Sequence, residues 1–245
     1  MALVHSPSIV TDGLIFGIDA ANPKSYPGSG TDWYDLAQNY DAILKDGATI
    51  SGNGVSLAYS ASSYEGGNDY VEVQTTELNT LLAPWTMTCW FNLASSGYDT
   101  ASQTVALMGC SGTSPTGFGK MIGIGGGSRE RKPWGILYDS TGAQKQVGNL
   151  STVGSQIPFD TWHMMTMTHD NTTAKIYLND TLDTSTACSG YTPYPSNITQ
   201  KFTIGLNIIY WHFGGLIAMA HVYNRDLSES EIAQNFNAFR RRFNV

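Results

Sequence analysis

Three carboxylates lie close together in the segment EGGNDYVE, and paired carboxylates are the groups with which glycosidases work. They are Glu65, Asp69 and Glu72. Glycoside hydrolysis needs an acid and a nucleophile or base about 5–9.5 Å apart. Successive side chains of a strand point to opposite faces, so Asp69 and Glu72 diverge, and Glu65 precedes a Gly-Gly turn. This spacing predicts turn and surface carboxylates, and no catalytic pair.

The histidines and serines form no known catalytic or metal-binding pattern. His163 and His169 share one face of a predicted strand but lie roughly 20 Å apart. The sequence has no His-x-His or His-Glu-x-x-His segment of the kind that binds zinc. The segment GTSPT at residues 112–116 lacks the last glycine of the Gly-x-Ser-x-Gly elbow of hydrolases. We therefore expect no enzymatic activity and no cofactor.

Aromatic residues in or beside loops rich in glycine and proline are the remaining candidates for binding. Exposed aromatic rings stack on sugar rings or anchor protein interfaces. The candidate residues for binding a glycan or a partner are Trp134, Tyr138, Tyr210 and Trp211. The alternative is that these rings cap the hydrophobic core, and for Tyr210 and Trp211 both interpretations stay open.

Composition and charge narrow the classes of partner. The chain has 245 residues and a net charge of −7. A nucleic acid would need a basic stripe, and the one basic run, Arg240–Arg242, suits the end of a helix. No run of about 18 apolar residues and no signal-peptide pattern occurs, so we expect no membrane partner. Cys89, Cys110 and Cys188 fit free thiols better than a disulfide framework.

The elements that would position these residues are short strands. The segment WTMTCWF alternates, with Trp85, Met87, Cys89 and Phe91 on one face, as a strand does. Short strands without helices between them indicate a β-sandwich or barrel. We expect strands over residues 14–20, 40–50, 52–60, 70–73, 85–93, 104–109, 120–124, 134–139, 161–169, 174–178, 201–206 and 215–223, and a hairpin near 142–146.

One long helix is predicted at the C-terminus. Ser228 and Glu231 form a capping box, and a stripe of apolar residues follows at helical spacing. The expected organisation is an N-terminal arm over residues 1–12, a β domain over 13–227, and a helix over 228–245 that packs on that domain or on a neighbour.

The first strand leads into a segment that could be a binding loop or a well-specified turn. Asn22-Pro23 and Pro27-Gly28 set turns. We expect Trp33 and Leu36 to anchor the loop on the core, and Asp35 to accept backbone N–H groups in the turn. A structural role is the main interpretation, and a role in ligand binding is the alternative.

Five segments resemble, in their order, the laminin-G-like, concanavalin A-like jelly-roll family. They are GLIFGIDAANPKSYPGSGTDWYDL, GGNDYVEV, WTMTCWF, TWHMMTMTHDNTTAKIYLND and FGGLIAMAHVYNRDLSESEIAQNFNA. The resemblance implies an all-β fold, a two-sheet antiparallel jelly-roll sandwich to which the C-terminal helix is added. Domains of this family often bind calcium at the sandwich rim through an aspartate and backbone carbonyls. Spacing does not choose among Asp69, Asp99, Asp139 and Asp170, so we assign no metal ligand.

A narrower resemblance bears on function. The opening DAANPKSYPGSGT and the closing VYNRDLS and NFNAFRRRF look like virion structural proteins of tailed bacteriophages that carry this domain. This implies a non-enzymatic virion protein, made in the host cytoplasm, that serves as a capsid decoration or a tail or fibre component through contacts with other virion proteins. The alternative is a carbohydrate-binding adhesin that recognises host surface glycans. Fold alone does not decide between them, and the oligomeric state stays open.

Overall fold

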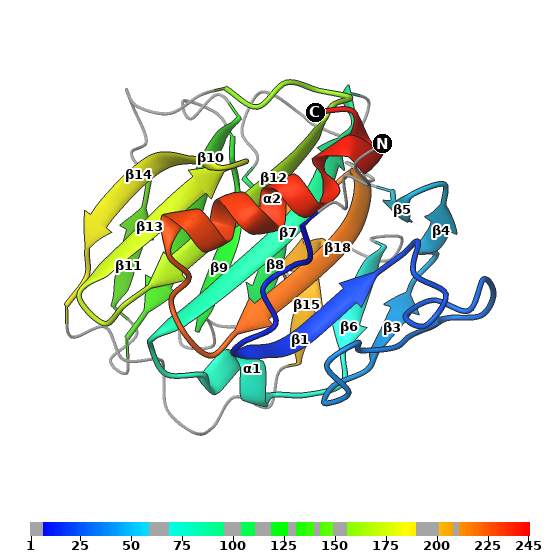
Figure 1. Cartoon of the computed structure of the whole chain (residues 1–245), viewed down its shortest axis with the longest axis horizontal. Helices are drawn as coiled ribbons and strands as arrows, with labels where there is room; N and C mark the ends of the chain where they lie inside the picture. Colours follow the sequence, from blue (N-terminus) through cyan, green and yellow to red (C-terminus); the bar gives the residue numbers. More distant parts are fainter. Residues whose placement is uncertain are drawn as a thin grey trace, which may run out of the picture.

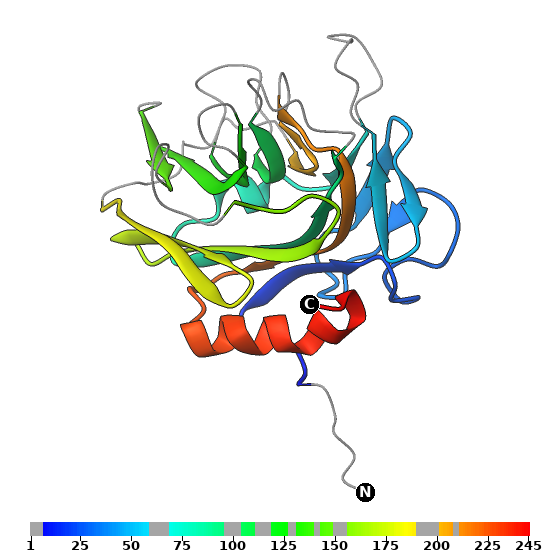
Figure 2. The ribbon, with the colours of Figure 1, turned by 90° about the horizontal axis from the view of Figure 1, so that it is seen from above.

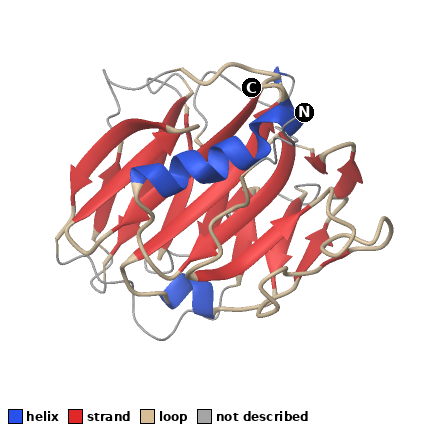
Figure 3. Cartoon of the chain, in the orientation of Figure 1, coloured by secondary structure: helices blue, strands red, loops and turns tan. Residues whose placement is uncertain are grey.

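Two antiparallel sheets pack face to face, and one helix covers the outer face of one of them (Figures 1 and 2). The structure is a computed structural model that describes residues 7–58, 69–95, 104–110, 119–126, 131–139, 143–148, 156–189, 201–207 and 211–245. The prediction of an all-β jelly-roll sandwich with a C-terminal helix is confirmed. Figure 3 shows how far strands dominate over helix in this architecture.

The helix-covered sheet, called sheet A, has eight strands in the order β14-β13-β12-β7-β18-β5-β4, with β1 paired to β18. Its strands are β1 (Leu14–Asp19), β4 (Thr49–Ser51), β5 (Gly54–Leu57), β7 (Trp85–Leu93), β12 (Trp162–His169), β13 (Thr173–Leu178), β14 (Thr181–Ala187) and β18 (Gly215–Tyr223). The two longest strands, β7 and β18, lie side by side at its centre.

The second sheet, called sheet B, has eight strands in the order β11-β10-β9-β8-β15-β6-β3-β2. Its strands are β2 (Asp32–Trp33), β3 (Ala42–Lys45), β6 (Tyr70–Val73), β8 (Val105–Cys110), β9 (Lys120–Gly125), β10 (Lys132–Tyr138), β11 (Gln144–Val147) and β15 (Phe202–Ile204). The remaining elements are the hairpin β16 (Leu206–Asn207) and β17 (Trp211–His212), and the helices α1 (Glu77–Thr80) and α2 (Glu229–Phe243).

Strand β7 shows why the sandwich needs a third layer. Met87, Cys89 and Phe91 point into the core between the sheets, as their alternation predicted. Trp90 points the other way and is 1% exposed, because it lies in a second cluster beneath α2. The outer face of sheet A therefore carries buried apolar side chains as well as the inner face. Cys89 and Cys188 are buried free thiols, as expected.

Helix α2 supplies the cover for the outer face of sheet A. The predicted capping box is present, with the Ser228 side chain and the Glu231 side chain each accepting an N–H from the other residue's backbone. Phe236 and Phe243 of the apolar stripe stack on Trp90, with ring centroids 5.6 and 4.6 Å apart. No helix in the described ranges is long and apolar enough to cross a bilayer.

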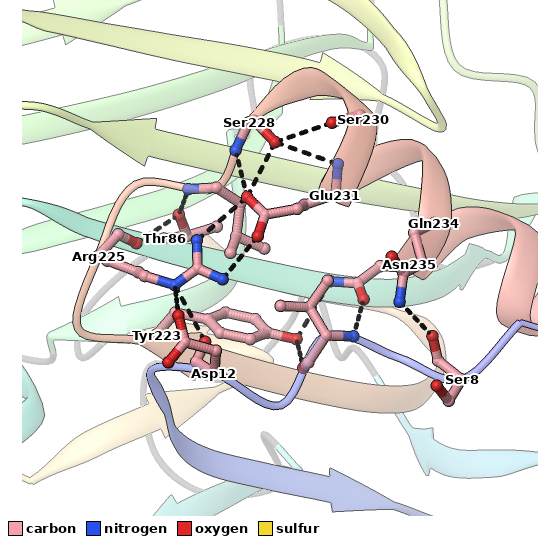
Figure 4. Close-up of polar contacts among 12 residues, drawn as sticks. Ser8, Asp12, Thr86, Tyr223, Arg225, Ser228, Ser230, Glu231, Gln234 and Asn235 are labelled. Carbon is pink, nitrogen blue, oxygen red and sulfur yellow. Dashed lines mark hydrogen bonds and ion pairs between the residues drawn. The ribbon is translucent and has the colours of Figure 1, made fainter.

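Residues 7–12 lie in the angle between α2 and β18 (Figure 4). The Val10 N–H donates to Asn235 Oδ1 at 2.8 Å, and Tyr223 Oη donates to the Val10 carbonyl at 3.1 Å. Gln234 Nε2 donates to the Ser8 carbonyl at 2.7 Å. The described part of the arm is thus hydrogen-bonded to this chain's own helix and sheet.

One carboxylate joins the loop between β2 and β3 to strand β1. Asp35 is 5% exposed, and its two oxygens accept the backbone N–H groups of Gly17, Ala37, Asn39 and Tyr40 at 2.7–3.0 Å. Trp33 is fully buried in the core, whereas Leu36 is half-buried. The structural roles expected of Asp35 and Trp33 are confirmed.

We expect Asp35→Ala to lower the free energy of unfolding by about 3 kcal/mol, because it leaves buried N–H donors without an acceptor. Asp35→Asn keeps one accepting oxygen, so its free energy of unfolding should lie between those of the unchanged protein and of Asp35→Ala. The exposed Asp32 of the adjoining strand β2 is the control, and Asp32→Ala should change stability by less than about 0.5 kcal/mol. Chemical denaturation measures all three, and equal effects at positions 32 and 35 would refute this role.

Phe243→Ala should destabilise the protein by about 3 kcal/mol, since it opens a cavity against Trp90 and Trp162. Arg241, exposed in the same helical turn, gives the control variant Arg241→Ala. Thermal denaturation followed by circular dichroism compares them. A small, equal shift in both variants would mean that α2 contributes little to the stability of the sandwich.

Stability should fall as pH falls from 6.5 to about 4. Burial lowers the pKa of His221 from 6.5 to about 4, against the opposing charges of Asp19 and Asp35. The unfolded chain therefore takes up this proton first, and the free energy of unfolding drops by roughly 3 kcal/mol across the window. His221→Gln should flatten this part of the profile in denaturation titrations at several pH values. An unchanged slope would show that other groups cause the loss.

Candidate functional site

The outer face of sheet B carries an aromatic cluster that is separate from the core between the sheets. Alternate residues of β10 reach this face, while Leu137 between them belongs to the inner core. A Cβ added at Gly135 would point inward and come within 2.6 Å of Met167 Sδ of sheet A, so the Met167 side chain would have to shift. The cluster consists of Ala106, Met121, Trp134, Ile136 and Tyr138, with Trp211 packed against it.

The structure brings three of the four predicted binding residues into this cluster. The rings of Trp134 and Trp211 meet edge to face, with centroids 5.4 Å apart and planes at 87°. Tyr138 lies on the same face of β10 as Trp134. Tyr210 lies outside the described residues. The two tryptophans lie on strands almost 80 positions apart in the sequence. They meet because the hairpin β16–β17, which carries Trp211, packs over β8.

The rings differ in what they offer to a ligand. Trp134 is 2% exposed and Tyr138 is 7% exposed, so neither presents an open face. Burial also raises the pKa of the Tyr138 phenol, which stays protonated at neutral pH. Trp211 is partly exposed. It is the ring of the cluster that a ligand can reach, and the buried Trp134 fixes its orientation.

The carboxylates on the same sheet are engaged elsewhere. Glu72 of β6 forms ion pairs with Lys201 at 3.0 Å and with Lys45 at 3.8 Å. Burial acts to raise the pKa of Glu72, but hydrogen bonds from Lys201 and Gln74 and the two lysine charges outweigh it and hold the pKa below its ordinary value. Such a carboxylate is a poor proton donor at neutral pH. Glu65 lies outside the described residues.

The aspartates suggested for calcium act as hydrogen-bond acceptors in turns. Asp69 accepts the Ala58 N–H, Asp139 accepts the Ala143 N–H, and Asp170 accepts the N–H groups of Thr172 and Thr173. Across the described ranges, no three His, Cys, Asp or Glu side chains gather as ligands would. A rim calcium ion held by one aspartate and backbone carbonyls stays a prediction, and Asp99 lies outside the described residues.

The sequence held a signal for part of this cluster. In KPWGILY, Trp134, Ile136 and Tyr138 recur at every second position, which places them on one face of a strand. Met121 and Ala106 carry no such signal, because their membership depends on the register of β9 and β8 against β10.

Comparison with solved structures finds similar folds in toxin binding domains. One is the binding domain of botulinum neurotoxin DC in complex with SialylT, with a TM-score of 0.67 and 13% identity over 93% of this chain and 52% of that chain. A botulinum neurotoxin serotype D/C binding domain gives a TM-score of 0.68 at 13% identity over 92% of this chain and 52% of that chain.

A third similar structure is of botulinum neurotoxin type C, whose cell entry depends on interaction with two ganglioside molecules. Its TM-score is 0.66 at 13% identity, over 92% of this chain and 51% of that chain. The chain thus spans about half the length of these structures. At this identity they show a shared fold. A search of curated protein sequences finds no match.

A family model of laminin G type, described as the concanavalin A-like lectin/glucanases superfamily, matches residues 65–233. The matched segment is well over half of the chain, and the family predicted from the sequence segments is confirmed. The protein belongs to the concanavalin A-like lectin/glucanases superfamily.

Proposed function

We propose that this protein is a non-enzymatic binding module that recognises glycans on a cell surface. The observation that carries this proposal is the partly exposed ring of Trp211, held edge to face by the buried Trp134. An aromatic ring offers its face to the C–H groups of a sugar. A ring already fixed by its neighbour loses little conformational freedom when a ligand binds, so more of the contact energy remains as affinity.

The comparisons and the carboxylates support the same proposal. The family includes lectins. Of the similar toxin structures, one is a complex with SialylT, and another belongs to a toxin whose cell entry depends on two ganglioside molecules. Glu72, the best-placed carboxylate on sheet B among the described residues, is neutralised by Lys45 and Lys201. This favours binding without hydrolysis.

We propose a tailed-phage virion as the setting, on the sequence resemblance alone. Residues 7–12 and the apolar side of α2 are engaged by sheet A of the same chain, so contacts with other virion proteins would use the outward side of α2 or other surfaces. Glycan binding and display on a virion are compatible, because a displayed domain can carry a receptor-binding surface.

Trp211→Ala should weaken binding to a surface glycan by roughly tenfold or more, which corresponds to about 1.4 kcal/mol of lost contact. A glycan array probed with the full chain identifies the ligand, and calorimetry then measures the affinity. Trp211→Tyr keeps an aromatic ring and should recover part of the affinity.

Leu182 is a matched control, since it is exposed and apolar but lies on β14 of sheet A. Leu182→Ala should bind as the unchanged protein does. If no glycan on the array binds the full chain, the proposed function is wrong. If Trp211→Ala and Leu182→Ala bind equally well, the cluster on sheet B is not the binding site.

A further inference from the structure

A hollow at the edge of the sandwich is another place where the described residues offer room for a ligand. It has a volume of about 290 Å³ and opens to solvent beside the loop that follows β1. Ile50 of the edge strand β4 closes one side. Pockets for small molecules usually start near 300 Å³, so this hollow suits a single small ring.

The side chains that line the hollow are apolar except for the Tyr26 hydroxyl. Tyr26 contributes an aromatic ring, and Pro23, Pro27 and Ile50 contribute aliphatic surface. Tyr26 also packs partly against the core, and its hydroxyl donates to the Gly30 carbonyl at 3.1 Å, so the ring is held at both ends. A fixed tyrosine ring flanked by prolines matches the C–H face of a pyranose.

The polar groups of the hollow accept hydrogen bonds and donate few. Pro23 and Pro27 have no N–H and can offer only carbonyl oxygens. The N–H groups of Ala20, Ala21 and Tyr26 already donate to Ala218, Asp19 and Asn22. A ligand must therefore bring donors, as sugar hydroxyls do.

Charge argues against an anionic ligand. None of the residues that line the hollow has a charged side chain. A phosphate or carboxylate placed there would lose its hydration without gaining a positive partner. A neutral ligand pays no such cost.

The loop is preorganised around the hollow. Asn22 caps it by accepting the N–H groups of Ser25 and Tyr26 at 2.8 Å. The Ser25 hydroxyl donates to the Tyr34 carbonyl at 2.6 Å and accepts the Asp19 N–H at 3.1 Å. Gly28 has a φ of +95° with open space around it, so its role is conformational and leaves the mouth of the hollow clear.

We infer that this hollow binds one neutral saccharide ring, stacked on Tyr26 between Pro23 and Pro27. The inference rests on the proposed glycan-binding function and adds a second subsite to it. The sequence predicted a structural role for this loop. The same hydrogen bonds that build its turn also shape the hollow, so the loop would serve both structure and binding.

The test uses the full chain labelled with ¹⁵N and a panel of neutral methyl hexopyranosides as probes. We expect amide shifts confined to Ala21, Tyr26, Gly28 and Ile50, with a dissociation constant on the order of 1 mM. Ala21→Phe fills the exposed mouth without removing core packing, and should weaken binding at least about tenfold. Tyr26→Phe keeps the ring and should bind within about threefold of the unchanged chain.

The outcomes separate the two proposals. If the amide shifts are confined to the surroundings of Trp211 and Ala21→Phe binds with unchanged affinity, the hollow is not a saccharide site. The proposed glycan-binding function would remain intact. No shift with any hexopyranoside and no binding on the glycan array would overturn both. Free sialic acid, an anionic probe, should not shift the amides of the hollow, and equal binding of this sugar would overturn the neutral specificity.

Discussion

The need to cover the outer face of sheet A determines most of this structure. A sheet that packs another sheet on one face can leave its other face to solvent, and then alternates apolar and polar residues. Strand β7 alternates, but its outer face is buried too: Thr86 and Thr88 are at most 1% exposed, and Trp90 lies on the same outer face. Burying a tryptophan removes 150–250 Å² of surface from water, worth roughly 4 kcal/mol or more. Helix α2 provides that burial.

The cover also decides which surfaces remain for binding. Residues 7–12 and α2 are hydrogen-bonded to each other and to β18, so both described ends of the chain are committed to sheet A (Figure 4). Among the described residues, the outer face of sheet B and the loops at the sandwich edge are not covered in this way. The two candidate sites lie in these places. They differ in construction, since the cluster around Trp211 is built on strands and the hollow beside Tyr26 is built on a loop.

Elements with a strong local pattern could be predicted from the sequence, and sites assembled from distant strands could not. Strand β7 and helix α2 were predictable because period-two alternation and a capping box are local signals. Strand β14 was missed because TLDTSTA has no apolar alternation and pairs with one neighbour at an edge. The burial of Trp134 depends on Trp211, and the hollow depends on Ile50. Neither dependence is visible along the chain.

The helix cover and the hollow are joined through a single carboxylate. Asp19 ends β1, accepts the Ala21 N–H at the wall of the hollow, and receives two hydrogen bonds from Arg242 of α2 at 2.7 and 3.0 Å. Arg242 Nη2 also donates to the Asn53 carbonyl in the turn beside β4. Charge-assisted bonds of this kind are strong when partly buried. The C-terminal end of the helix therefore braces the loop from behind, so a ligand entering the hollow does not have to order it. The interaction that completes the fold of sheet A thereby lowers the cost of binding at its edge.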